Sequence, residues 1–194
     1  MSYSEFTSKE LFHLAIESAS QKRSDNTLRY LKELVSREPD HIDALFLTGA
    51  AYATIGMFEE AVEYLERTVS IDPDFFIARF QLGISLLAMA KPDEGCMNFE
   101  HICNSKCPTY LKFFSKGLIY SQRNDKDKAI ELLEKGIESS ENKALSSDME
   151  GVIEALKNMP AESFNDQIIE SEYAYSEDIL KSSEFLIDAY KIQG

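Results

Sequence analysis

Apolar residues along most of this chain follow the spacing of amphipathic helices, and the same arrangement returns every 34 residues. One aromatic position marks the period most clearly, and it is occupied by Phe12, Phe46, Phe80 and Phe114. A period of this length is typical of stacked helix–turn–helix units. The pattern therefore predicts an all-α stack of four helix pairs, in residues 8–41, 42–75, 76–109 and 110–143.

Small residues recur where the two helices of each pair must approach closely. This position is held by Ala15, Gly49, Gly83 and Gly117. Gly56 and Asn124 mark the turn between the helices in the second and fourth blocks, because these residue types suit turns. A single pair buries only one of its sides, so the stack depends on contacts between neighbouring pairs.

The second block, residues 42–75, resembles the tetratricopeptide repeat (TPR). The positions that define that repeat carry Leu45, Thr48, Gly49, Tyr52, Ala61, Leu65, Thr68 and Pro73. The other blocks match in the same register, and the first block diverges most. The resemblance implies a right-handed TPR superhelix, an α-solenoid, of four helix pairs. It also implies that the protein binds other proteins through its concave surface.

The first helix of each pair carries a second apolar stripe, beside the one that meets its partner helix. In TPR proteins this second stripe lines the concave groove. We therefore expect a peptide-binding groove made by Phe12, Ile16, Phe46, Ala50, Ile77, Phe80, Ile84, Leu87, Leu111, Phe114 and Leu118. Familiar TPR grooves that clamp a terminal carboxylate carry Lys, Asn and Arg at these positions, so that mechanism is not expected here.

The repeated Phe occupies a position that such repeats do not need for their own packing, so we expect it to point outward. Four exposed Phe side chains would present roughly 600–1000 Å² of apolar surface, more than a soluble monomer usually shows in one patch. Neighbouring helices must then shade the rings, or a ligand or another part of the chain must cover them. In the first case the rings would imply no binding function.

The repeats are followed by two further segments. Residues 144–160 form one more amphipathic stripe and predict a helix that caps the stack, which gives a solenoid domain over residues 1–160. Residues 161–194 form an acidic amphipathic C-terminal extension, with a stripe at Ile179, Ser183, Leu186, Ile187 and Tyr190. Residues 163–192 could fold back into the groove, exchange into the groove of a second copy as a homodimer, or extend the solenoid.

Composition narrows the function further. Acidic residues outnumber basic residues by 34 to 20, and the net charge of −14 argues against nucleic-acid binding. No apolar run approaches the ~20 residues of a membrane span. The first residues show no secretory signal, so we expect a cytoplasmic protein.

No residue set suggests catalysis, a cofactor or a metal. Cys96, Cys103 and Cys107 lie close together in the sequence, and His101 lies among them. There is no CxxC pair, however, and His101 falls on a different helix face, so reduced packing cysteines are the better interpretation. No phosphate-binding Gly loop or nucleophile with a base is visible, and we do not expect an enzyme.

Three functions remain open from the sequence. The leading hypothesis is a protein-interaction adaptor whose groove holds an apolar peptide or amphipathic helix. The second is a dedicated chaperone for a hydrophobic client, similar to the TPR chaperones that hold translocator subunits before type III secretion. The third is a self-assembling structural protein, in which the extension of one copy fills the groove of the next.

Overall fold

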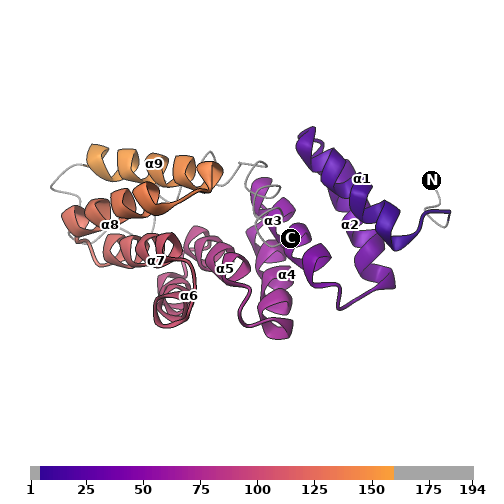
Figure 1. Cartoon of the computed structure of the whole chain (residues 1–194), viewed down its shortest axis with the longest axis horizontal. Helices are drawn as coiled ribbons and strands as arrows, with labels where there is room; N and C mark the ends of the chain where they lie inside the picture. Colours follow the sequence, from indigo (N-terminus) through magenta and orange to yellow (C-terminus); the bar gives the residue numbers. More distant parts are fainter. Residues whose placement is uncertain (1–4, 160–194) are drawn as a thin grey trace.

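Residues 5–159 are described by the computed structural model, and they form nine α-helices without a strand (Figure 1). The helices are α1 (Ser8–Ser20), α2 (Ser24–Arg37), α3 (Ile42–Thr54), α4 (Phe58–Ile71), α5 (Phe76–Ala88), α6 (Pro92–Asn104), α7 (Thr109–Gln122), α8 (Lys126–Ser139) and α9 (Lys143–Asn158). Each of the four predicted blocks holds one helix pair, and α9 follows as the capping helix. The all-α solenoid is confirmed, whereas the extension over residues 161–194 lies outside the described residues.

The turn inside every helix pair has the same backbone conformation. Residues with positive φ occur at Lys22 (55°), Gly56 (77°), Ala90 (55°) and Asn124 (59°), again 34 residues apart. A left-handed residue lets the chain reverse within a very short loop after the first helix. The sequence indicated this at Gly56 and Asn124. Lys22 and Ala90 adopt the same conformation although their side chains do not favour it.

Close helix approach explains the recurring small residues. A Cβ atom added at Gly49 would lie 2.8 Å from Leu65 Cγ in α4, and one at Gly83 would lie 2.5 Å from Phe99 Cε1 in α6. Both distances are shorter than van der Waals contact. The first and second helices of each pair therefore pack at a separation that a larger side chain would not permit.

The helices form two layers of different exposure. α3 buries ten successive residues, Ala44–Ala53, and α5 buries every residue from Ile77 to Leu87 except Arg79. By contrast, α4 buries only Ala61, Leu65 and Thr68. A helix buried all round is covered on all its faces, whereas a helix with one buried stripe lies at the surface. We call α1, α3, α5 and α7 the inner layer and α2, α4, α6 and α8 the outer layer.

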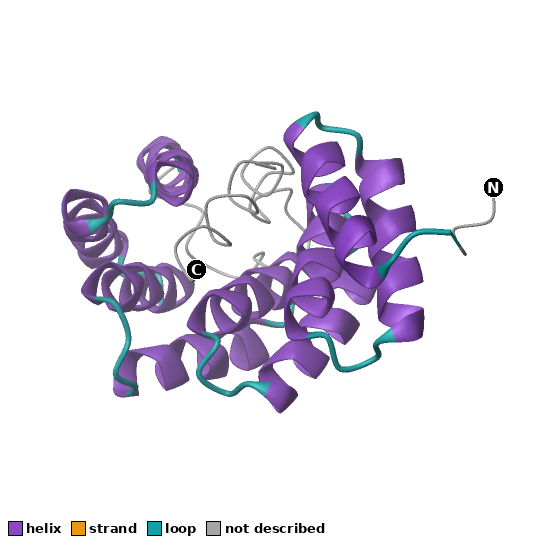
Figure 2. Cartoon of the chain, turned by 45° about the vertical axis from the view of Figure 1, so that its right-hand side comes forward, coloured by secondary structure: helices purple, strands orange, loops and turns teal. Residues whose placement is uncertain are grey.

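Contacts run from each helix to the next along the chain, and α3 additionally contacts α5 within the inner layer. The stack therefore forms one continuous arc, with α1 and α2 at one end and α8 and α9 at the other (Figure 2).

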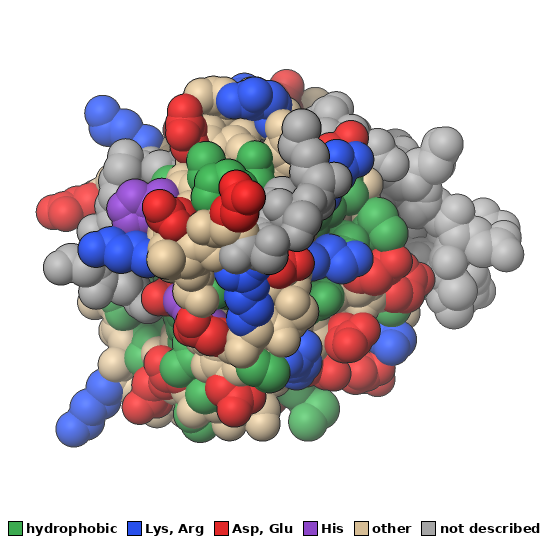
Figure 3. Space-filling view, turned by 90° about the vertical axis from the view of Figure 1, so that its right-hand side faces the viewer, with side chains coloured by type: hydrophobic (Ala, Val, Ile, Leu, Met, Phe, Trp, Pro, Cys, Tyr) green, Lys and Arg blue, Asp and Glu red, His purple; other side chains and the backbone are tan. Residues whose placement is uncertain are grey.

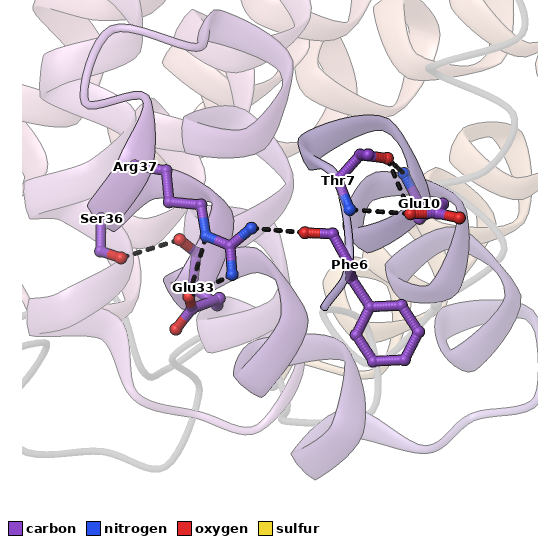
Figure 4. Close-up of polar contacts among 6 residues, drawn as sticks. All are labelled: Phe6, Thr7, Glu10, Glu33, Ser36 and Arg37. Atoms are coloured by element: carbon purple, nitrogen blue, oxygen red, sulfur yellow. Dashed lines mark hydrogen bonds and ion pairs between the residues drawn. The ribbon is translucent and has the colours of Figure 1, made fainter. Parts of the chain in front are cut away.

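The N-terminal end of the stack is fixed by side-chain hydrogen bonds (Figure 4). Thr7 and Glu10 form a capping box, in which the Thr7 N–H donates to Glu10 Oε2 at 2.7 Å and the Glu10 N–H donates to Thr7 Oγ1 at 3.3 Å. The Arg37 guanidinium donates to the Phe6 carbonyl and forms an ion pair with Glu33 at 2.7 Å. These contacts join the start of α1 to the end of α2.

The surface at this end carries both signs of charge. Figure 3 shows acidic and basic side chains mixed over the visible face, with apolar side chains scattered between them. Such a mixture of charges is typical of a surface exposed to water.

The C-terminal end is held by α9, which packs on α8. The Asn142 side chain caps α9 by accepting the Leu145 N–H at 3.0 Å. Near the other end of the helix, Lys157 Nζ lies 3.4 Å from Glu134 Oε1. The helix buries Leu145, Met149, Val152 and Ile153, among others, as expected of a helix that shields the last repeat.

Candidate functional site

The eleven residues expected to line the groove all lie on the inner layer, on α1, α3, α5 and α7. We call this set the inner face. Ten of its members are less than 9% exposed, and only Ile16 is partly exposed. All eleven belong to the main hydrophobic core or pack directly against it. The stripe inferred from the sequence therefore forms part of the continuous apolar core along the stack.

The four repeated Phe residues do not point outward, and that expectation was wrong. Phe12 stacks on His41 with ring centroids 5.5 Å apart, and Phe46 lies 4.9 Å from Phe75. Phe75 follows Phe46 by the same 29 residues that separate His41 from Phe12, and each partner is the N-cap of the next inner helix. These two rings therefore fill the joint between one repeat and the next.

The other two rings pack between helices in a related way. Phe80 lies 5.5 Å from Phe99 in α6 and 6.5 Å from Phe114 in α7, as measured between ring centroids. Phe114 in turn contacts Tyr110 at 5.9 Å. Phe80 and Phe114 are both fully buried. The four repeated Phe rings therefore hold neighbouring repeats together. This is the alternative from the sequence analysis in which neighbouring helices shade the rings.

Two further contacts place inner-face side chains against the outer layer. A Cβ added at Gly136 in α8 would clash with the Phe114 ring, and one added at Gly95 in α6 would lie 2.9 Å from Leu87 Cδ2. Phe114 and Leu87 therefore occupy space left by glycines of the partner helix. Their burial follows from tight pairing of the two layers.

The remaining aliphatic members of the inner face are also buried, except for the partly exposed Ile16. They are Ile16, Ala50, Ile77, Ile84, Leu111 and Leu118. Ile16, Ala50, Ile84 and Leu118 occupy the same position in the four repeats, so they form a row along the stack. A row of aliphatic side chains can contribute apolar burial and shape, but it cannot recognise a charge or bind a metal.

An aromatic and cationic cluster that the sequence did not reveal joins the first two repeats. Lys32 Nζ donates to the Tyr52 hydroxyl at 3.0 Å, and the Tyr52 and Tyr64 rings stack with centroids 5.7 Å apart. Arg67 lies over the Tyr64 ring and donates to the Pro39 carbonyl at 2.8 Å. Burial raises the pKa of Tyr64 above its ordinary value.

The most perturbed carboxyl group lies on the capping helix. Burial raises the pKa of Asp148 to about 7. Loss of hydration disfavours the charged form, and no neighbouring cation offsets this effect. Asp148 is therefore a local source of instability at neutral pH.

The three cysteines are free thiols and half-buried. Burial raises the pKa of each thiol, which lowers its reactivity at neutral pH. Within residues 5–159, no three His, Cys, Asp or Glu side chains gather as a metal site would require. His101 lies on the exposed side of α6, whereas Cys103 faces Lys112 of α7, with its sulfur 3.9 Å from the Lys112 carbonyl oxygen.

Comparison with known families agrees with the helix pairs. The sequence profile of the tetratricopeptide repeat matches residues 42–75 and 113–143. These segments are the second predicted block and most of the fourth. The pairs α1–α2 and α5–α6 have the same architecture, although the profile does not match their sequences.

Solved structures with the same fold include three of MamA. A crystal structure of the MamA protein is 17% identical, with 96% of this chain and 93% of that chain covered and a TM-score of 0.59. MamA from Desulfovibrio magneticus RS-1, residue 41 to the end, is 18% identical over 96% and 94% of the two chains, also with a TM-score of 0.59.

The structure of MamA MSR-1 C2 is 21% identical over 71% of this chain and 79% of that chain, with a TM-score of 0.58. At these identities the likeness supports the solenoid fold alone. No curated protein matches the sequence. Among the described helices, none has the length and apolar character needed to cross a membrane.

Proposed function

We propose that the inner face binds an apolar peptide or an amphipathic helix of another protein, because two of the four helix pairs match the tetratricopeptide repeat, a protein–protein interaction module. The main support is the composition of that face, which is apolar at all eleven positions along four successive repeats. Polar peptides would lose hydration there without gaining a hydrogen-bond partner. A partner with its own apolar stripe would lose no hydration of polar groups there and would bury further apolar area.

The structure changes which residues carry this proposal. The four Phe side chains hold the repeats together and are at most 8% exposed, so they offer a partner almost no surface. Ile16, the one member of the inner face that is partly exposed, is the better candidate contact. A large aliphatic side chain contributes about 1.5–3 kcal/mol when it passes from full exposure to full burial, and Ile16, which is already partly buried, would contribute less.

One feature favours an adaptor or chaperone inside the cell. The three free thiols fit a reducing compartment, and we place the protein in the cytoplasm. A chaperone that protects a hydrophobic client would use the same inner face as an adaptor. The two roles differ in whether the client aggregates when the protein is absent.

The test uses charge placed on the inner face. Ile16→Asp and Ile16→Lys should each weaken the binding of a labelled amphipathic helix with an apolar stripe, measured by fluorescence anisotropy. Ile16 is already partly exposed, so a change there disturbs the core least. Phe46→Ala and Phe80→Ala are poor tests, because losing a buried ring costs about 3–5 kcal/mol of stability.

Met97→Asp is the matched control. Met97 lies on α6 in the outer layer and is 69% exposed. It should leave binding unchanged. A scrambled peptide that has no apolar stripe should not bind. If the inner-face variants stay folded and bind the peptide as tightly as the unmodified protein, the inner face is not the binding site.

A further inference from the structure

We infer that the joint between α6 and α7 binds an acidic segment of a partner protein through a basic patch, which consists of Lys106, Lys112 and Lys116. α6 and α7 pack against each other, and Lys106 belongs to the loop that joins them (Figure 1). None of the three lysines is a member of the inner face, so the inference is independent of the proposed function. It depends on how charge is distributed along the chain, on the residue types at this joint, and on the ion pairs of the described residues.

Positive charge is concentrated in one part of this acidic chain. Residues 101–124 hold the three lysines and Arg123 but no aspartate or glutamate, which gives a charge of +4. All other residues together hold sixteen basic and thirty-four acidic side chains, a charge of −18, and the two parts add up to the total of −14. A positive region on an acidic protein attracts anionic groups that the rest of the surface repels.

The residue types at this joint differ from those at the two earlier joints, between α2 and α3 and between α4 and α5. The positions equivalent to Lys112 and Lys116 in the second and third repeats hold four buried, uncharged side chains, Ala44, Thr48, Ala78 and Leu82. By contrast, Lys112 is half-buried and Lys116 is exposed. A lysine in such a place packs its aliphatic stem on the protein and keeps its ammonium group in water. The α6–α7 joint therefore presents cations where the earlier joints present only neutral residues.

Two of these cations lie beside the same thiol, and they have no acidic partner. The Cys103 sulfur on α6 is 3.9 Å from the Lys112 carbonyl oxygen. Burial raises the pKa of the Cys103 thiol, and the nearby ammonium groups of Lys116 and Lys112 partly offset that rise. Glu100 also lies near this thiol, but its carboxylate pairs with Arg123 at 3.2 Å. Among the ion pairs within residues 5–159, none involves a lysine of the basic patch.

A short acidic segment fits this patch better than an extended anionic surface does. Lys112 and Lys116 are four residues apart on α7, which corresponds to ~6 Å along the helix axis. Carboxylates at every fourth residue of a helix, or at every second residue of an extended peptide, repeat at about the same distance. Salt screens charges further away than ~8 Å at physiological ionic strength, so the net charge of the protein does not cancel the local attraction. A membrane or a nucleic acid is larger than the patch and would also meet the acidic remainder of the surface.

The experiment measures how a short labelled peptide with regularly spaced glutamates binds the full-length protein, by fluorescence anisotropy. A second peptide carries glutamine in place of every glutamate. Lys112→Gln with Lys116→Gln removes two cations of the patch and keeps side chains of similar shape. Lys9→Gln with Lys22→Gln is the matched control, because it changes the net charge equally at two exposed lysines of the first repeat. Far-UV circular dichroism checks the fold, and Lys116→Gln alone, at an exposed position, replaces the double variant if the latter unfolds.

We expect the glutamate peptide to bind and the glutamine peptide not to bind. An exposed ion pair contributes about 1.4- to 5-fold in affinity. Lys112→Gln with Lys116→Gln should therefore weaken binding by about 2- to 25-fold, and Lys116→Gln alone by about 1.4- to 5-fold. The control variant should bind as tightly as the unmodified protein, and added salt should weaken the binding.

Three results would overturn the inference. The first is equal binding of the two peptides, because carboxylates would then play no part. The second is equal weakening by the patch variant and the control variant, because net charge rather than the patch would then determine affinity. The third is a different occupant: vesicles that contain phosphatidylserine, or a second copy of the chain detected by light scattering, would associate with the patch in a lysine-dependent way while the glutamate peptide would not bind.

Discussion

The contact between Phe114 and Gly136 allows the packing of the inner face to be tested quantitatively. A Cβ atom at position 136 would lie 3.2 Å from Phe114 Cγ and closer still to Cδ1 and Cε1 of the same ring. Gly136 lies inside α8, where replacing glycine by alanine normally stabilises a helix by about 0.5–1 kcal/mol. Here the clash should reverse the sign of that change.

The magnitude follows from the two opposing terms. Overpacking a core costs about 1–3 kcal/mol, so Gly136→Ala should lower the free energy of unfolding by about 1–2 kcal/mol. Phe114→Ala should lower it by about 3–5 kcal/mol, because it empties a fully buried site. In the Phe114→Ala background the clash is gone, and Gly136→Ala should become neutral or stabilising. The coupling between the two changes should therefore be about 2–3 kcal/mol.

Urea unfolding followed by far-UV circular dichroism measures the four proteins of this cycle. Phe114→Leu can replace Phe114→Ala if the latter leaves too little stability. Gly56→Ala serves as the control, since nothing lies within 4 Å of a Cβ there and its cost comes from the positive φ of 77°. Its effect should simply add to that of Phe114→Ala. Additivity of Gly136→Ala with Phe114→Ala would refute the packing described for the ring.

Three further predictions concern single positions. Ala90→Gly should raise the free energy of unfolding by about 0.5–1 kcal/mol, because glycine adopts the left-handed turn without strain, and chemical denaturation measures it. Tyr52→Phe should lower it by about 0.5–1.5 kcal/mol through loss of the Lys32 hydrogen bond, and Lys32→Met should abolish the difference between Tyr and Phe. Burial raises the pKa of Asp148 above its value in the unfolded chain. Asp148 therefore does not reduce the free energy of unfolding below about pH 4, and it lowers that free energy progressively as the pH rises from about 4 to about 7. Asp148→Asn should remove this pH dependence and raise the free energy of unfolding by about 2 kcal/mol at pH 8. This is roughly half of the free energy that corresponds to the full pKa shift, because the side chain is partly exposed.

The sequence predicted the fold well because its signals are local and repeat in register. The 34-residue period placed all four helix pairs, and the stripe in residues 144–160 placed α9 to within two residues at its C-terminus. The turns were found only where the residue type favours a positive φ. Lys22 and Ala90 were missed because their conformation is imposed by the repeat rather than by their own side chains.

The sequence was less informative about the direction in which the Phe rings point. Helical periodicity gives the face on which a residue lies, but it does not give the distance to the next repeat. The structure brings the N-cap of each following helix against that face, as with His41 on Phe12 and Phe75 on Phe46. The 29-residue spacing of these pairs was visible in the sequence and could have indicated the joints.

The aromatic and cationic cluster of Lys32, Tyr52, Tyr64 and Arg67 was missed for a different reason. Its members come from α2, α3 and α4, so only the packing of two repeats brings them together. No repeat contains the whole set, and no periodic signal marks it.

Methyl NMR of the full-length protein tests the central claim most directly. A labelled sample is titrated with an amphipathic peptide that carries an apolar stripe, and the methyl shifts of the inner aliphatic row are followed. The account predicts that Ile16, Ile84 and Leu118 shift together and saturate, while the exposed Met97 methyl on α6 stays unchanged. Saturable shifts confined to the outer layer, or an inner row that does not respond at any peptide concentration, would contradict it.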